Sequence, residues 1–332
     1  SISILLIRVK RQHKSLLIHS INMSSVSTLL FISQQVVIYI GIFLLAVGCF
    51  GQPFVLTIFL SLKTFRESSC AFYLTIMSIM NTLLLFTGLF TFVMINGFNI
   101  NWTAISLFYC KFRMFYVQIC ILISFTCMCL AIIDQYLATC SNPRLHRFNQ
   151  IKYARRIILI AACIWICHGI PALLFNNHII SSEHNQTICA LTNVIFQKYY
   201  TAVYLTTLSG GLPIIIMIIF SFLSYRNIRQ LAHRTIPMVR RELDKQITNM
   251  VLVQGCFGII AVTPQIIYSF YSLAIGTPTD PTTSIILPSL WNLITTIYYF
   301  HFISSFPIYF LVSKRFRQQL FYVFHKISHT LT

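Results

Sequence analysis

The chain has 332 residues, of which 57% are hydrophobic and only 9% are charged. An ordinary soluble domain has about 25% charged residues, so this composition excludes that class and indicates a membrane protein. The net charge of +18 would also suit a nucleic-acid-binding protein, and the positions of the basic residues decide between the two.

Seven stretches of the chain, each at least eighteen residues long, contain no Asp, Glu, Lys or Arg. They are residues 15–62, 68–110, 114–133, 157–182, 199–225, 246–279 and 281–313. A helix of about 20 mostly apolar residues crosses a bilayer, so we predict an all-α membrane protein with a bundle of seven transmembrane helices. The stretches are continuously apolar and do not alternate over about ten residues, which disfavours a transmembrane barrel.

The basic residues gather in alternate loops. Seventeen of the 24 fall in segments 63–67, 140–156, 226–245 and 314–326. They are Lys63, Arg66, Arg144, Arg147, Lys152, Arg155, Arg156, Arg226, Arg229, Arg234, Arg240, Arg241, Lys245, Lys314, Arg315, Arg317 and Lys326. The loops assigned to the opposite side hold only Lys111, Arg113 and Lys198. By the positive-inside rule these segments are cytoplasmic, which places the N-terminus outside. Because the charge follows the loops and no single face or tract, we expect a lipid bilayer and no nucleic acid as its partner.

On this topology residues 1–33 are an extracellular segment, residues 34–313 are the transmembrane domain, and residues 314–332 are a cytoplasmic helix and tail. The first 22 residues fit poorly, because they place four basic residues outside and precede the first methionine, Met23. We expect them to be absent from the mature protein, as an upstream mis-translation or a cleaved segment. The run SISILLI is too short for a signal peptide, and its basic residues follow it.

The first two spans each contain an amide side chain. Gln52 follows Gly51 in the first span, and Asn81 lies within SIMNTLLLF in the second. In a bilayer such a group usually bonds a neighbouring helix, a contact worth about 1 kcal/mol, and we favour this role for Asn81.

The third span has a cysteine at one end and a polar triplet at the other. Cys110 is followed, 24 residues later, by Asp134, Gln135 and Tyr136. At 1.5 Å per residue Cys110 and Gln135 lie roughly 37 Å apart, one at each surface of the bilayer. This cysteine and an Asp-Arg-Tyr-like triplet resemble the rhodopsin-like (class A) G-protein-coupled receptors.

The later spans extend the resemblance over residues 34–325. Trp165 in the fourth span and Pro213, Pro264 and Pro307 in the fifth, sixth and seventh stand where the family carries a tryptophan and prolines. The sequence SKRFRQQLFYVF then resembles the amphipathic eighth helix that lies on the inner membrane surface. The resemblance implies a plasma-membrane receptor that binds an extracellular ligand and a heterotrimeric G protein, with no cofactor.

The chain departs from the family at several residues of the activation machinery, which the resemblance places at Asp134, Gln135, Tyr136, Pro264, Pro307 and Phe310. Gln135 replaces an arginine, a permanent charge with a rigid fork of donors. FPIYF replaces Asn-Pro-x-x-Tyr, so that Phe310 stands at the tyrosine. We expect a looser inactive state with basal signalling or altered coupling. A receptor-like bundle that binds a ligand or partner without G-protein coupling stays an alternative.

At the position of Asn81 the family usually carries a carboxylate that helps to bind a sodium ion. An amide is neutral and a weaker ligand, so we expect no sodium site. His168 has no Cys, His or carboxylate at ligand spacing, so we also expect no other metal site. The chain has only six acidic residues and no nucleophile with a base and an orienting group, so we expect no enzyme.

Of eleven cysteines, only Cys110 and Cys189 fall in segments assigned to the oxidising outer side. The family resemblance implies a disulfide between them, which would contribute roughly 4–5 kcal/mol in the chain-entropy model. Three glycosylation acceptors, Asn22, Asn101 and Asn185, also fall on the outer side.

The ligand class is narrowed by two residues. Val117 stands where amine receptors carry an aspartate, and Phe300 stands where opsins carry the retinal-binding lysine, so we expect neither amine nor retinal. We expect a pocket at Val117, lined by the polar but uncharged residues Gln118, Gln265, Tyr268 and Asn292. Such a pocket would suit a peptide or a neutral small molecule, and we favour a peptide.

Overall fold

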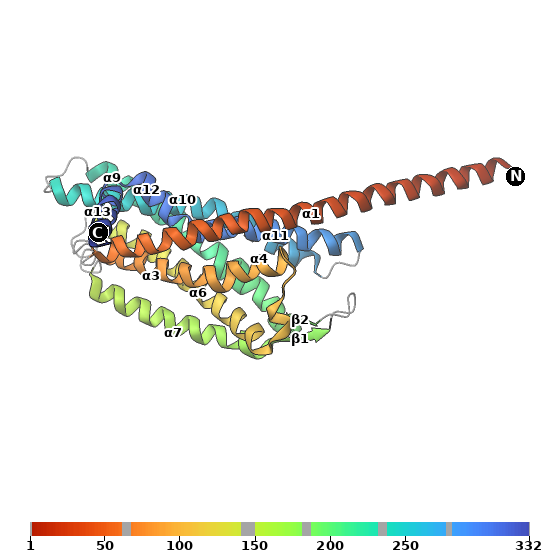
Figure 1. Ribbon diagram of the computed structural model, residues 1–332, viewed down its shortest axis with the longest axis horizontal. Helices are drawn as coiled ribbons and strands as arrows, with labels where there is room; N and C mark the ends of the chain where they lie inside the picture. The colour runs from red at the N-terminus through yellow and green to blue at the C-terminus, as the bar shows by residue number, and fades with distance from the viewer. Residues whose placement is uncertain are drawn as a thin grey trace.

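The computed structural model describes residues 2–61, 68–140, 150–180, 187–231, 238–276 and 281–331. These residues are almost entirely helical, and the long helices run roughly along one axis (Figure 1). This architecture follows from the apolar stretches, because a helix satisfies every backbone polar group within its own segment and so can cross lipid.

Within the described residues, six helical segments are long and apolar enough to cross a membrane. They are Ser27–Ser61, Ser69–Asn96, Leu107–Thr139, Ile151–Phe175, Val194–Asn227 and Gln246–Ile275. The seventh predicted span forms α11 (Pro281–Ile303) and α12 (Ser305–Val312), which meet at Ser304. The prediction of a seven-helix bundle is therefore confirmed.

Three of the spans are single helices throughout. The third span is α6 (Leu107–Thr139), the fourth is α7 (Ile151–Phe175) and the sixth is α10 (Met238–Ile275). Of the six segments α6 is the most buried and α7 the least, so α6 is the central helix. Helix α10 starts at Met238, eight residues before the membrane segment at Gln246.

Two spans change their helical pitch in the half of the bundle that carries the hairpin. We call this end the outer end and the opposite, basic end the inner end, after the predicted topology. The second span runs through α3 (Ser69–Leu84), the π-helical turn η1 (Leu85–Leu89) and α4 (Phe90–Asn96). The fifth runs through α8 (Val194–Tyr199), the π-helix η3 (Tyr200–Gly211) and α9 (Leu212–Leu231). Wide turns of this kind occur mostly at functional sites.

Helix α1 (Ile2–Ser61) passes through the predicted boundary at residue 34 as one continuous helix. Its first part extends beyond the bundle at the end where strands β1 (Asn176–Ile180) and β2 (Thr187–Leu191) lie (Figure 1). The helix therefore does not mark where an N-terminal segment would end, and the predicted division at residues 33 and 34 stays a prediction.

Polar side chains join the helices inside the bundle. Gln52 of α1 donates from Nε2 to the carbonyl of Phe302 at 2.8 Å and to the hydroxyl of Ser305 at 3.0 Å, which ties α1 to both halves of the seventh span. Ser124 of α6 donates to Oδ1 of Asn81 at 2.6 Å, so Asn81 makes the predicted hydrogen bond between helices.

Close backbone approach also holds the fifth and sixth spans together. A Cβ atom on Gly210 of η3 would lie 2.5 Å from Cγ1 of Ile266 in α10, a distance that real side chains do not adopt. Glycine is therefore required there if the two helices are to keep their spacing.

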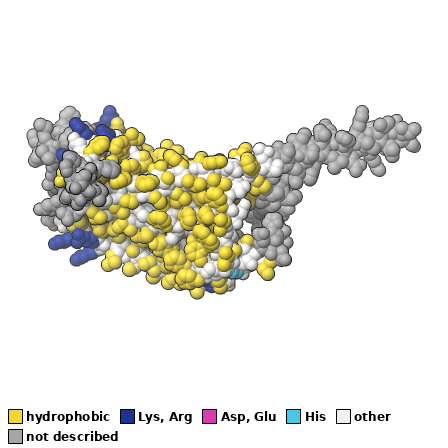
Figure 2. All heavy atoms as spheres, in the orientation of Figure 1, with side chains coloured by type: hydrophobic (Ala, Val, Ile, Leu, Met, Phe, Trp, Pro, Cys, Tyr) yellow, Lys and Arg dark blue, Asp and Glu magenta, His cyan; other side chains and the backbone are white. Residues whose placement is uncertain are grey.

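The sides of the bundle expose apolar side chains along its length, among them Leu159, Phe222 and Ile260 (Figure 2). A water-soluble protein rarely exposes so large an apolar surface, whereas lipid covers it. Lys and Arg side chains gather at the end of the bundle opposite the strands, as Figure 2 shows. This arrangement matches the predicted alternation of basic loops.

Helix α13 (Lys314–Leu331) follows α12 at that basic end. Phe316 is fully buried and packs edge-on against Tyr309, whereas Phe321 and Tyr322 are exposed. Arg317 donates from Nη1 to the carbonyl of Phe310 at 2.9 Å, which satisfies the end of α12. The predicted amphipathic eighth helix is thus present.

Candidate functional site

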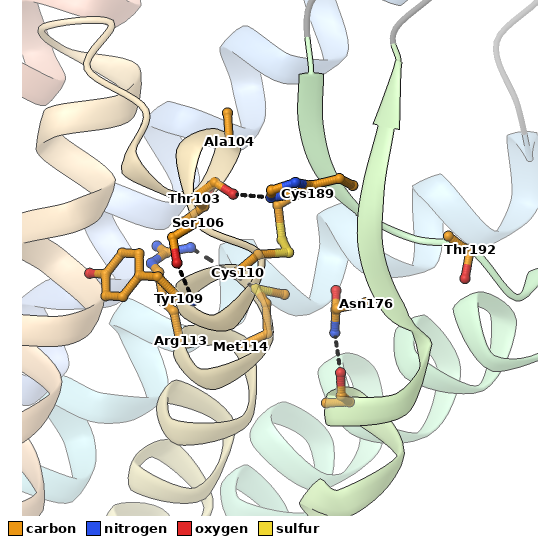
Figure 3. The surroundings of a disulfide bond; sticks show 12 residues. Thr103, Ala104, Ser106, Tyr109, Cys110, Arg113, Met114, Asn176, Cys189 and Thr192 are labelled. Atoms are coloured by element: carbon orange, nitrogen blue, oxygen red, sulfur yellow. Dashed lines mark hydrogen bonds between the residues drawn. A yellow bond between two sulfur atoms is a disulfide. The ribbon is translucent and has the colours of Figure 1, made fainter.

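A two-stranded hairpin lies at the outer end of α6. Strands β1 (Asn176–Ile180) and β2 (Thr187–Leu191) pair antiparallel, with His178 opposite Cys189. Cys189 forms the predicted disulfide with Cys110 of α6, and the two Cα atoms are 5.7 Å apart (Figure 3). His178 donates from Nε2 to the carbonyl of Thr103 in the short helix α5 (Trp102–Ile105) at 2.7 Å. The hairpin is therefore attached at two points.

A cavity of about 310 Å³ lies among α4, α6, η3, α10 and α11, with Ile188 and Cys189 of β2 on its wall. This volume is at the lower end of the usual range for ligand pockets, about 300–1,000 Å³. Six of the nineteen lining residues are aromatic: Phe92, Tyr200, Tyr204, Trp291, Tyr298 and Tyr299. Such a lining suits an apolar or aromatic group.

Two of the predicted pocket residues, Val117 and Gln265, line this cavity. The other three are not among its lining residues. Gln118 donates from Nε2 to Nδ1 of His168 in α7 at 2.8 Å, and Tyr268 donates to the carbonyl of Leu287 at 3.2 Å. The carbonyl of Asn292 accepts the hydroxyl of Thr296 within α11. Their roles in ligand binding stay predictions.

Arg113 also lines the cavity, so the expectation of an uncharged pocket is wrong for this site. Helix α6 begins at Leu107, after its N-cap Ser106, and therefore already contains Cys110 and Arg113. Figure 3 shows Arg113 one turn further into the bundle than Cys110. The sequence suggested an outer loop at this position because the uncharged stretch starts only at Met114. The sequence did offer a signal for this position. Arg113 is three residues after Cys110, so on one helix the two side chains are neighbours.

The guanidinium of Arg113 donates to two carbonyls in the wide turn η1. Nε lies 3.3 Å from the carbonyl oxygen of Thr87, and Nη2 lies 3.5 Å from that of Gly88. Both bonds are long for N–H···O contacts, and a guanidinium has five donors, so further donors are available to a ligand.

Two buried polar atoms of residues that line the cavity have no hydrogen-bond partner among the described residues. They are Oε1 of Gln265 in α10 and the hydroxyl of Thr295 in α11, and both residues line the cavity. Gln265 is only 3% exposed. A buried polar atom without a partner costs about 1–3 kcal/mol, which a ligand with a complementary group would recover.

The inner end of α6 carries a second group of polar contacts. Both carboxylate oxygens of Asp134 lie 2.8 Å from the hydroxyl of Ser69, the first residue of α3. Beside it, Oε1 of Gln135 accepts the hydroxyl of Thr248 in α10 at 2.6 Å. Both Asp134 and Gln135 are buried. Neighbouring residues of α6 therefore bond two different helices at its inner end.

The sequence profile of the family described as 7 transmembrane receptor (rhodopsin family) matches residues 51–313. The chain belongs to this family. A comparison with curated proteins found no match.

The remaining activation residues of this rhodopsin-family receptor lie at different depths: Tyr136 follows Gln135 at the inner end, whereas Pro264 directly precedes Gln265 on the cavity wall. Tyr136 packs edge-on against Phe220 of α9, with ring centroids 5.5 Å apart. Pro264 lies inside α10 and Pro307 inside α12. Phe310 stacks on Phe306 one turn away. Their part in activation stays a prediction.

The receptor also uses a residue that the family pattern does not indicate. The hydroxyl of Tyr309, one position before Phe310, donates to Oε1 of Gln254 in α10, and Tyr309 is fully buried. A tyrosine one position earlier points about 100° away around the helix, which directs it toward α10. The buried polar pair of Gln254 with a tyrosine in the FPIYF motif was the signal that the sequence offered.

The predicted glycosylation acceptors lie in different surroundings. Asn101 is the N-cap of α5, and its Oδ1 accepts from Thr103 Oγ1 at 2.6 Å and from the backbone N–H of Ala104 at 3.2 Å. Asn185 and the side chain of Asn22 lie outside the described part of the receptor. Modification at all three sites stays a prediction.

Proposed function

We propose that this receptor binds an extracellular ligand in the outer cavity and transmits that event to heterotrimeric G proteins at the cytoplasmic face of the plasma membrane. The proposal places the N-terminus and the hairpin outside. The cysteine pair on one side and the basic residues on the other support this orientation.

One observation carries the proposal. A single central helix, α6, lines the outer cavity and ends in the contacts of Asp134 with Ser69 and of Gln135 with Thr248. A ligand that favours a different position of α6 or α10 would bias whether these inner contacts form. A ligand shifts a conformational equilibrium only through such a difference in affinity between two states.

For the ligand we propose a peptide that inserts only one end. The cavity is too small for a folded segment but large enough for a terminal group, and its aromatic walls suit such a group. Val117 lines the cavity and carries no charge, which disfavours an amine.

A second candidate function is a receptor that binds without G-protein coupling, and Gln135 favours it. Glutamine has two neutral donors and one acceptor, so it lacks the charge and the five-donor fork that arginine would offer to a G protein. In this alternative the contact between Gln135 and Thr248 is only a structural bond between helices.

The test is a cell-based assay of basal G-protein activation for each G-protein class. The epitope-tagged receptor and the variant Gln135→Arg are compared at matched surface expression. Activation above mock-transfected cells, changed by Gln135→Arg, supports coupling. Silence of both forms at good surface expression supports the non-coupling alternative.

A further inference from the structure

We propose that the ligand of the outer cavity presents a carboxylate to Arg113. The proposal rests on the function proposed above only in taking the cavity as the ligand site. It names the chemistry of the ligand, which neither the fold nor the family specifies.

The charge of the cavity is carried by Arg113. Among the described lining residues it is the sole charged side chain. The nearest acidic residue along α6 is Asp134, which lies 21 residues away at the opposite end of the helix, or about 31 Å. Within the described part of the chain, the contacts of Arg113 are all long and all to neutral atoms: the two carbonyl oxygens and, at 4.0 Å, the sulfur of Met114.

A guanidinium in such surroundings recognises a carboxylate better than a neutral group. Its planar fork matches the two oxygens of a carboxylate in parallel hydrogen bonds. Charge-assisted bonds of this kind are roughly twice as strong as neutral ones, and the aromatic walls exclude water that would weaken them.

The far wall of the cavity defines the rest of the ligand. Oε1 of Gln265 can only accept, so it requires an N–H or O–H donor from the ligand. The hydroxyl of Thr295 can accept or donate. Tyrosine and tryptophan rings line the same cavity. The matching ligand has a carboxylate, an aromatic or aliphatic body and a hydrogen-bond donor.

Two sources supply this chemistry: a small free carboxylic acid and the free C-terminus of a peptide. The shared carboxylate is the proposal, and the source is a result of the test. The probes are benzoate with its neutral analogue benzamide, and a tripeptide ending in phenylalanine as the free acid and as the C-terminal amide.

The experiment measures access to Arg113 in the purified full-length receptor. Phenylglyoxal, which modifies guanidinium groups, is applied with and without each probe at constant ionic strength, and labelling is followed by mass spectrometry of the peptide that contains Arg113. Arg155 and Arg156, at the opposite end of the receptor, are the internal controls.

We expect benzoate to slow labelling of Arg113 several-fold, benzamide to leave it unchanged, and Arg155 and Arg156 to react equally in all samples. Stronger protection by the free-acid tripeptide than by benzoate assigns the carboxylate to a peptide terminus, and the reverse assigns it to a small acid. Equal labelling with each acid and its amide overturns the proposal. So does an Arg113 that stays unlabelled without any probe, because the proposal requires an accessible guanidinium.

A second measurement separates binding from structural support. Benzoate should raise the thermal unfolding temperature of the receptor, because a ligand that binds only the native state stabilises it. We expect this rise to vanish in Arg113→Gln, to shrink in Arg113→Lys, and to persist in Lys111→Gln, which removes a charge from the same turn of α6 outside the cavity lining. A rise that persists in Arg113→Gln contradicts the proposal.

Neither measurement uses a G protein. A receptor that is silent in the coupling assay but protected by benzoate keeps this inference and loses the coupling function. A receptor that couples to G proteins but is not protected by benzoate keeps the proposed coupling function and loses this inference.

Discussion

The hydroxyl of Thr248 donates a 2.6 Å hydrogen bond to Oε1 of Gln135 and so joins the sixth span to the inner end of the third. Both side chains are buried, with exposed fractions of 1% for Thr248 and 4% for Gln135. The receptor thus has a neutral contact between α6 and α10 where its family carries an arginine. This contact gives the first prediction.

Replacement of Thr248 by valine should raise basal G-protein activation. The change removes the hydrogen-bond donor and keeps the shape of the side chain. The arrangement in which residue 248 contacts Gln135 then loses about 1 kcal/mol relative to the arrangement in which the two are apart, which is about a fivefold shift in their populations. The matched control is Thr263→Val in the same helix, because the hydroxyl of Thr263 donates only to the carbonyl of Ile259, one turn away. Unchanged basal activity in Thr248→Val would show that this contact does not restrain the receptor.

The contact of Asp134 with Ser69 should contribute to thermal stability. A carboxylate at the first residue of α3 also interacts favourably with the helix dipole. Replacement of Ser69 by alanine should cost about 1.5–3 kcal/mol, the range for a hydrogen bond to a charged group. The measurement is thermal unfolding of the purified receptor in detergent.

The control for this pair is a double-mutant cycle with Asp134→Asn. If the two side chains act together, Ser69→Ala should cost clearly less in the Asp134→Asn background. If the losses in the free energy of unfolding of the two single variants simply add in the double variant, the two side chains stabilise the receptor through separate contacts.

The features that could be predicted from the sequence are those that depend on many residues together. A span needs about 20 apolar residues, so the uncharged stretch 114–133 locates the middle of the third span, although α6 extends beyond it to Leu107 and Thr139. The disulfide and the bond of Asn81 also follow, because topology decides which cysteines meet oxidising conditions and lipid forces amides to pair.

Features that depend on one residue of helix register could not be predicted. Arg113 was assigned to a loop because a charge usually ends an apolar span, yet its long side chain lies against η1 inside the bundle. The wide turns η1 and η3 add a residue per turn and rotate every later side chain, and the glycines that they contain, Gly88, Gly210 and Gly211, do not by themselves predict a change of pitch. Tyr309 was missed for the same reason, since the family pattern points to Phe310.

Loss of the disulfide should lower surface expression and thermal stability. The bond closes a loop between residues 79 positions apart, which corresponds to roughly 4–5 kcal/mol in the chain-entropy model. We expect Cys189→Ser to reduce surface expression severely in a quantitative immunofluorescence assay. Cys163→Ser is the control, because Cys163 is a free, exposed cysteine on α7. Equal expression of both variants would contradict a structural role for the bond.

Replacement of Gly210 by alanine should destabilise the receptor by about 1–3 kcal/mol, the usual cost of overpacking. The new Cβ would meet Cγ1 of Ile266 at 2.5 Å, so either the Ile266 side chain must change its conformation or η3 and α10 must separate. The companion variant Ile266→Ala removes the atom concerned. In that background Gly210→Ala should cost much less, and an unchanged cost would place the strain elsewhere. Thermal unfolding of the four forms measures both effects.

Glycosylation of Asn101 can be tested without disturbing the fold. Aspartate is as good an N-cap as asparagine but carries no glycan, so Asn101→Asp should keep α5 intact. We expect the variant to lack one glycan and therefore to migrate faster in a gel than the wild-type receptor. Endoglycosidase treatment of both proteins should remove this difference, and surface expression should be retained. If the variant and the wild-type receptor migrate equally before treatment, Asn101 carries no glycan.

The attachment of the hairpin to both α6 and α5 has a consequence for timing. Because the disulfide and the bond of His178 hold β2 on the wall of the cavity, that wall cannot swing aside as a free flap would. Differences in affinity between related complexes lie mostly in the dissociation rate. A bound ligand should therefore leave slowly, and a signal from this receptor should outlast the pulse of ligand that started it.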